Sequence, residues 1–299
     1  MRIGQWIGRG LATIVGIGLL TAGGVYGKSQ AALTAKGTRP TRNALTITAD
    51  SAALALGRKL TTVNGCRECH SASLGGNVMA DDAAFGRLVA PNITTGKGGV
   101  LSHYDDRALD AAIRDGISWD GRKLLIMPSA EYAGLADADM AAIIADIRAS
   151  APVDNEVPAI ALGPIGRALV ASGKIEFAND VIDHNRTTIA VAPTGGTVEH
   201  GRYLAAGCKG CHMQDYGGGP LPGAAPGAKP SANITPSGNI GKWSQVEFTR
   251  IFRDGIRPDG RKVDASMPWQ VLGKLSDEEL QGIYLYLKTV PANNVAAAK

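Results

Sequence analysis

Two copies of one short cysteine–histidine pattern carry the chemistry that this sequence offers. They read Cys66-Arg67-Glu68-Cys69-His70 and Cys208-Lys209-Gly210-Cys211-His212. The spacing C-x-x-C-H is the attachment signature of c-type haem. Two thiols one helical turn apart can each form a thioether with a haem vinyl group. The adjacent histidine then reaches the iron from the same side, so each motif predicts one covalently bound haem c.

Other uses of paired cysteines explain less of the pattern. A lone C-x-x-C can be a redox dithiol or half of a zinc site. The chain has four cysteines, and both pairs are followed at once by histidine. A zinc site built from all four thiols would leave both histidines unexplained. We therefore expect thioethers at Cys66, Cys69, Cys208 and Cys211. The alternative is a buried or disulfide-forming pair beside an incidental histidine.

The proximal iron ligands are then His70 and His212, and a distal ligand must come from elsewhere in each half. Met127 and Met267 occupy matched positions, each before proline and about sixty residues after the first cysteine of its motif. Proline fixes φ and removes a donor, which suits an extended loop across an open haem face. Histidine and methionine together fill both axial positions and raise the haem potential. The alternative for each methionine is a place in the core.

Further polar residues support weaker interpretations. Asn92 and Asn233 recur in Asn-Ile-Thr sequences, where each side chain would either donate to a haem propionate or fix a turn. Arg122 and Arg261 follow Asp-Gly and are expected to be exposed turn charges. The histidines that do not recur are expected in surface or capping roles. They are His103, His184 and His200.

Ordered markers show that the two halves are copies of one domain. The first cysteine, Asn-Ile-Thr, Asp-Gly-Ile and Met-Pro recur in the same order at offsets of 139 to 142 residues. Apolar spacing predicts helices over 50–63 and 104–114, and a last helix capped by Asp137 with an apolar stripe containing Met140. In the second half, Ser244 and Ser276 each precede a glutamate by three residues, which fits a capping box.

This order predicts two tandem domains, each with one haem. We divide the chain into an N-terminal signal-anchor or transmembrane helix, a tether, a first domain, a connector, a second domain and a tail. Their ranges are 1–30, 31–49, 50–150, 151–194, 195–292 and 293–299. Only 5% of the residues are aromatic, so a haem inside each domain would supply apolar bulk that the sequence lacks.

Charge excludes one class of partner. The formal net charge is +4, but residues 1–49 carry six basic and no acidic residues. Residues 50–150 carry ten basic and thirteen acidic residues, and residues 195–292 carry eleven and nine. Neither domain is strongly basic, so we expect no nucleic-acid partner.

The N-terminal segment has eighteen residues without charge, from Gly10 to Gly27. It fits either a signal peptide cleaved after Ala31, which would leave a soluble periplasmic protein, or a retained membrane anchor. We favour the anchor. Haem is attached to C-x-x-C-H motifs outside the cytoplasm in bacteria, which places both domains on the periplasmic side of the inner membrane.

The motifs together resemble class I, mitochondrial-type cytochrome c domains in tandem, over roughly residues 50–150 and 195–292. Besides the attachment motifs, the likeness rests on Asn-Ile-Thr, Met-Pro and the closing Leu-Ser-Asp-Glu-Glu-Leu. The combination is similar to the cytochrome subunits of periplasmic, membrane-bound alcohol and gluconate dehydrogenases. Those subunits commonly carry three haems, whereas this sequence has two motifs. The resemblance implies an all-α fold, in which each haem lies in a crevice with one edge exposed.

The expected function is single-electron transfer in a periplasmic respiratory chain. The donor would be a dehydrogenase or a quinol-oxidising complex, and the acceptor a cytochrome or terminal oxidase. We therefore expect an electron-transfer subunit without a substrate site of its own, more than an enzyme. The alternative is a diheme enzyme, such as a peroxidase or thiosulfate dehydrogenase, which needs an open or displaceable iron position. The matched Met-Pro pair argues against that alternative.

Overall fold

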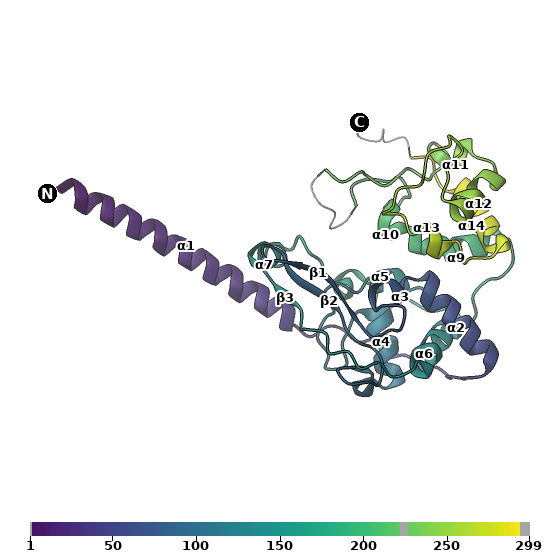
Figure 1. The fold of residues 1–299 in the computed structure, drawn as a ribbon, viewed down its shortest axis with the longest axis horizontal. Coiled ribbons are helices and arrows are strands. Elements are labelled where there is room, and N and C mark those ends of the chain that lie inside the picture. Colours follow the sequence, from purple (N-terminus) through teal and green to yellow (C-terminus); the bar gives the residue numbers. More distant parts are fainter. Residues whose placement is uncertain (1, 222–226, 294–299) are drawn as a thin grey trace.

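The computed structural model describes residues 2–221 and 227–293. A long N-terminal helix, α1 (Arg2–Thr34), projects from two mostly helical units that follow each other along the chain (Figure 1). The first unit contains α2 (Ser51–Val63), α3 (Cys66–Cys69), η1 (Leu101–His103), α4 (Asp106–Asp115), α5 (Ser129–Tyr132) and α6 (Asp137–Ala149). The second contains α9 (Val198–Leu204), η2 (Ala205–Cys208), α10 (Lys209–His212), α11 (Asn239–Lys242), α12 (Gln245–Asp254), α13 (Trp269–Leu272) and α14 (Asp277–Thr289).

In both units the first helix crosses the last one at a glycine. A Cβ on Gly57 of α2 would lie 2.0 Å from the carbonyl oxygen of Ala142 in α6. A Cβ on Gly201 of α9 would lie 1.8 Å from the carbonyl oxygen of Gly282 in α14. Only glycine permits this approach, so the matched glycines fix the same helix crossing in both copies.

The apolar stripes that the sequence predicts form the two cores. Met140 is fully buried with the isoleucines of α6, against Leu60 and Leu109. In the second unit the same role falls to residues of α12 and α14, among them Phe248 and Leu280. Each core lies on the inner face of the helix crossing and supports the segments that carry the attachment motifs.

Helix ends agree with the predicted caps, with one correction. Both predicted capping boxes of the second unit form, at Ser244 and Ser276. Asp50, expected as the first residue of its helix, is instead the N-cap and accepts hydrogen bonds from two backbone amides of α2. Asp137, however, does not cap α6, because the N-cap position is Ala136. Asp137 is instead the first helical residue and pairs with the buried Arg114, 2.8 Å away. An acidic residue in a first turn still complements the helix dipole.

The expectation of an all-α fold is not confirmed as stated. Strands β1 (Asn77–Asp82), β2 (Gly86–Ala90) and β3 (Ala161–Leu162) form an antiparallel sheet in the order β1-β2-β3. Gly86 has φ of 107°, and a Cβ there would lie 2.2 Å from the Ala161 carbonyl oxygen, so glycine permits the third strand to pair. In the second unit the described residues of this region make only an isolated bridge between Gly219 and Ser231.

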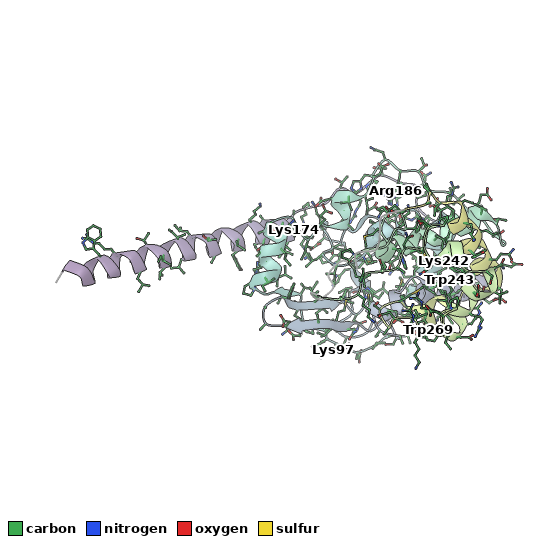
Figure 2. All side chains as sticks on the ribbon, turned by 90° about the horizontal axis from the view of Figure 1, so that it is seen from above. Lys97, Lys174, Arg186, Lys242, Trp243 and Trp269 are labelled. Carbon is green, nitrogen blue, oxygen red and sulfur yellow. The ribbon has the colours of Figure 1, made fainter. Side chains whose placement is uncertain are left out.

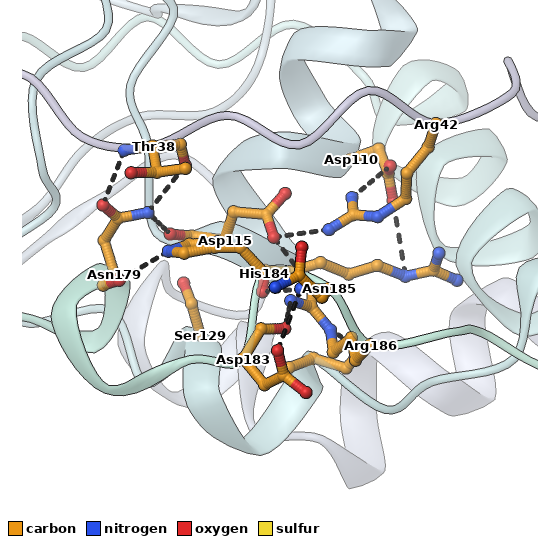
Figure 3. A network of polar contacts seen from close by, with 12 residues as sticks. Thr38, Arg42, Asp110, Asp115, Ser129, Asn179, Asp183, His184, Asn185 and Arg186 are labelled. Carbon is orange, nitrogen blue, oxygen red and sulfur yellow. Dashed lines mark hydrogen bonds and ion pairs between the residues drawn. The ribbon is translucent and has the colours of Figure 1, made fainter.

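The segments before and after the first unit fold onto it through a buried polar network (Figure 3). The carboxylate of Asp115 is fully buried and forms ion pairs with Arg42 and Arg186. Asn179, in α8 (Ala178–Val181), donates to the carbonyl oxygens of Thr38 and Asp115. Residues 31–49 and 151–194 therefore act as parts of the first unit's shell.

The two units contact each other through polar groups. Lys59 of α2 forms an ion pair of 2.6 Å with Glu279 of α14. The hydroxyl of Tyr203 in α9 donates to Asp139 at 2.5 Å and accepts from the amide of Ala136 at 3.0 Å. These contacts join the helix crossing of one unit to that of the other.

Among the described residues, α1 is the one helix long and apolar enough to cross a membrane, over Arg9–Thr34. Its C-terminal turns pack on α7 (Pro164–Ala171) (Figure 1). A signal sequence passes the same test of length and composition. Cleavage after Ala31 would divide α1 and separate Ser29, which is fully buried, from the rest of the protein.

Candidate functional site

The first cysteine motif lies at the floor of an apolar crevice. Gly65 has φ of 72° and turns the chain from α2 into α3, so that Cys66 and Cys69 face the same space. The crevice is otherwise lined mainly by aliphatic residues, together with Met127 and Tyr132. A flat, apolar group with two reactive vinyl edges fits this donor set, whereas a hydrated ion does not.

Each motif histidine is oriented by a backbone carbonyl. Nδ1 of His70 lies 2.8 Å from the carbonyl oxygen of Pro91, and Nδ1 of His212 lies 2.7 Å from that of Ala232. With Nδ1 as the donor, the lone pair of Nε2 remains free to bind a metal. Burial lowers the pKa of both rings, opposed by these hydrogen bonds, and so favours the neutral ligand form.

The carbonyl partners explain the Asn-Ile-Thr repeat, because each immediately precedes the asparagine. The amide of Asn92 donates to the carbonyl oxygen of Val153 at 2.7 Å, and its Oδ1 accepts from Thr94. Asn233 makes the equivalent bonds in the second unit, to the Asn293 carbonyl oxygen and from Thr235. The geometry supports the turn role, in which the asparagine fixes the loop that holds the histidine's partner.

The two Met-Pro loops have the same conformation. Pro128 has φ −80° and ψ 53°, and Pro268 has φ −78° and ψ 54°. In both loops the residue after proline donates to the methionine carbonyl oxygen at 2.8 Å. Met127 lines the crevice, and Met267 packs at the edge of the second core. Both loops then enter a one-turn helix, α5 or α13.

The Asp-Gly turns before these loops also have matching conformations in the two units. Gly116 and Gly255 end α4 and α12 with φ of 65° and 66°. The arginines that follow the second Asp-Gly bind the aspartate of their own turn, Arg122 to Asp120 at 2.6 Å and Arg261 to Asp259 at 2.6 Å. These are the exposed turn charges that the sequence predicts.

The chemistry of the thiols disfavours the other uses of a cysteine pair. Burial raises the pKa of Cys66 and that of Cys208 to about 12. A redox dithiol works through a lowered thiol pKa. Among the described residues, no group of three or more histidine, cysteine, aspartate or glutamate side chains could hold a metal ion. Cys66 and Cys69 both line an apolar crevice, which places the two thiols beside the vinyl groups of an apolar ligand.

The remaining histidines lie outside the crevice of the first unit. His103 stacks on Trp119, with ring centroids 4.8 Å apart. His184 contacts the carbonyl oxygen of Asn179 at 2.8 Å, and His200 contacts that of Gly195 at 2.7 Å. His103 is exposed, as expected, whereas His200 is buried within the second unit.

One feature that the sequence did not reveal is the position of α5 between the two motifs. The hydroxyl of Tyr132 donates to the carbonyl oxygen of Asn64, two residues before Cys66, at 2.8 Å. Its neighbour Glu131 faces the second motif, where a Cβ on Gly210 would lie 2.0 Å from Oε1. Burial raises the pKa of Glu131, and no cation among the described residues pairs with it. The two motifs are thus separated by a single helical turn.

Both the fold and the sites define a c-type cytochrome with two similar units. Residues 54–150 and 198–291 each match the family described as cytochrome c. The chain therefore belongs to the cytochrome c family, whose members carry covalently bound haem c and serve electron transport.

Several relatives are cytochrome subunits of dehydrogenases. The chain is 34% identical over 102 residues to the fructose dehydrogenase cytochrome subunit of Gluconobacter japonicus. It is 34% identical over 97 residues to the cytochrome c subunit of the alcohol dehydrogenase (quinone) of Gluconobacter oxydans (strain 621H). It is 37% identical over 98 residues to the gluconate 2-dehydrogenase cytochrome c subunit of Pantoea cypripedii. These matches cover 30–31% of this chain and 20–22% of each relative, and they confirm the predicted resemblance.

Proposed function

We propose that the protein is a diheme c-type cytochrome that transfers single electrons. Thioethers form at Cys66 and Cys69 in the first unit and at Cys208 and Cys211 in the second. The iron ligands are His70 with Met127 and His212 with Met267. The observation that supports this proposal most strongly is the pairwise identity of the two sites, in the histidine–carbonyl bond and in the Met-Pro turn.

If both axial positions of each iron are filled, neither iron can bind a substrate, so the protein is an electron carrier more than an enzyme. The bound haem supplies the one-electron redox change. The protein's own residues hold the imidazoles by their carbonyl partners, exclude water with the aliphatic crevice, and keep the methionine loops in place. The two units are in direct contact, so electron transfer between the two sites is intramolecular, and each site is present at a high effective concentration near the other.

We further propose that the donor is a dehydrogenase or a quinol-oxidising complex and the acceptor is another cytochrome or a terminal oxidase. The relatives named as dehydrogenase cytochrome subunits support the first of these partners. In this proposal α1 anchors both units to the periplasmic face of the inner membrane. Its length and apolar composition support the anchor.

Replacing each proposed methionine ligand tests the site assignment. Met127→Ala and Met267→Ala should each convert one low-spin haem to a high-spin one, measured by EPR of the oxidised protein. Met140→Leu is the matched control, because Met140 is fully buried in the core. An unchanged spectrum in either alanine variant would contradict that ligand. A high-spin haem in the unaltered protein, or turnover of peroxide, would instead support the diheme enzyme.

A further inference from the structure

The end of α1 is held by α7 through an arginine that has no acidic partner in the described part of the chain. Arg167 donates to Ser29 Oγ at 3.1 Å and to Gln30 Oε1 at 3.4 Å. Its guanidinium carbon lies 4.2 Å from the centroid of the Tyr26 ring. No carboxylate among the described residues forms an ion pair with Arg167, so no acidic side chain there neutralises its charge.

α1 and α7 form an open groove that extends far along the apolar helix. It is lined on one side from Gly18 to Tyr26 and on the other by residues of α7, with Leu162. Gly18 lies nine residues before Gly27, where the charge-free run ends. At 1.5 Å per residue this is about 14 Å, roughly half of a hydrocarbon core about 30 Å thick. If α1 spans the membrane, the groove opens into lipid.

The outer surface of this corner is apolar. Ile165 of α7 is 45% exposed, and Phe85, in the turn between β1 and β2, is 51% exposed. The two are tied together by the backbone. The amide of Gly163 donates to the Phe85 carbonyl oxygen at 3.0 Å, and the amide of Ile165 donates to that of Ala84 at 2.9 Å. They form one rigid apolar edge where α1 joins the first unit.

Charges around this edge have the arrangement that a membrane surface favours. Lys28 follows the apolar run directly, and the exposed Lys174 lies close to where α1 meets the first unit (Figure 2). The nearby acidic groups of the β1–β2 turn are already engaged. Asp81 pairs with Arg87 at 3.0 Å, and Asp82 accepts from two amides of its own turn. Among the described residues neither Lys28 nor Lys174 forms an ion pair, so both cations are available to lipid phosphates.

We propose that α7 and the β1–β2 turn lie in the headgroup region of the bilayer, with Ile165 and Phe85 in the acyl boundary and Arg167 at the phosphates. This inference rests on the proposed anchoring role of α1. It adds a second membrane contact, which fixes how the first unit is tilted. Two exposed residues near this contact also line the first crevice. Met79 lies in β1, and Ile160 directly precedes β3. The first site would thus face a fixed direction relative to the membrane.

Lipid photolabelling tests this contact on the full chain. The holoprotein is placed in vesicles of phosphatidylcholine and phosphatidylglycerol that contain a phospholipid with a diazirine near the headgroup. After irradiation, the labelled peptides are identified by mass spectrometry. Labels should appear on α1, on residues 161–171 and on residues 83–87. They should be absent from α12, where Val246 is 70% exposed but lies in the second unit.

Variants separate lipid contact from simple apolar reactivity. Ile165→Glu with Phe85→Glu should remove the labels from 161–171 and 83–87 while α1 stays labelled, and Val246→Glu should leave the pattern unchanged. Labels confined to α1 in the unaltered protein would overturn this inference and leave the anchor standing. An unlabelled α1 would refute the anchor itself, and this inference with it.

Discussion

The helix crossing in the second unit provides a sharp test of the packing described above. In Gly201→Ala, the new Cβ would lie 1.8 Å from the carbonyl oxygen of Gly282 and 2.8 Å from the amide nitrogen of Ile283. Ordinary contact requires more than 3.4 Å, so α9 and α14 must separate by about 1.5 Å. The atoms in the way belong to backbone and cannot rotate aside.

The expected loss of stability follows from two opposed terms. Overpacking at a rigid contact costs about 3 kcal/mol. Alanine regains about 1 kcal/mol through its higher helix propensity. The net change in the free energy of unfolding is about 2 kcal/mol, which lowers the Tm of a unit of this size by about 10 °C. The assay is thermal unfolding of the holoprotein followed by circular dichroism.

Gly207→Ala is the control for this prediction. A Cβ on Gly207 would meet nothing within 4 Å, and the residue lies in η2 of the same unit. We expect its Tm to stay within a few degrees of the unaltered protein. If Gly201→Ala melted at the same temperature as Gly207→Ala, the close helix crossing would be refuted.

Three further changes test the contacts around the sites. Lys59→Gln should weaken the contact between the two units at neutral pH, because it removes the ion pair with Glu279. Burial of Glu279 opposes its ionisation, but Lys59 and the hydrogen bonds from Ser276 lower the pKa of Glu279 below the ordinary 4.5. The stability difference from the unaltered protein should therefore shrink as pH falls below 4.5, and a constant difference in urea titrations would contradict the ion pair. Glu131→Gln should raise the potential of the second haem by roughly 20–60 mV, since a negative charge favours the ferric state. Equal shifts at both haems in a redox titration would contradict its placement. Arg186→Ala should lower the stability of the first unit by about 2 kcal/mol in urea unfolding, because Asp115 keeps its second arginine. A change below about 0.5 kcal/mol would show that the buried network is not needed.

Local chemistry made much of the protein predictable from its sequence. The capping serines Ser244 and Ser276 formed the expected boxes, because a cap depends on residues only three positions apart. The Met-Pro loops are alike in the two units because proline restricts its own backbone. The ordered recurrence of such markers was enough to predict a duplicated domain.

Long-range contacts were not predictable by the same reasoning. The partner of His70 is the backbone carbonyl of Pro91, and a carbonyl leaves no side-chain signature. The third strand pairs Gly86 with Leu162, seventy-six positions away, in a segment expected to be only a connector. The placement of α5 against the second motif depends on how the units dock, which no motif within one unit encodes.

Haem content and spin state show whether the chain holds two haems with both axial positions of each iron filled. The full chain, purified after expression with haem attachment, would be measured by mass spectrometry and by its pyridine haemochrome, then by EPR and optical spectra when oxidised. We expect two covalently attached haems per chain, both low-spin, with the optical signature of a methionine–iron bond. A single haem, or a high-spin signal from either site, would contradict the account of two saturated electron-transfer centres.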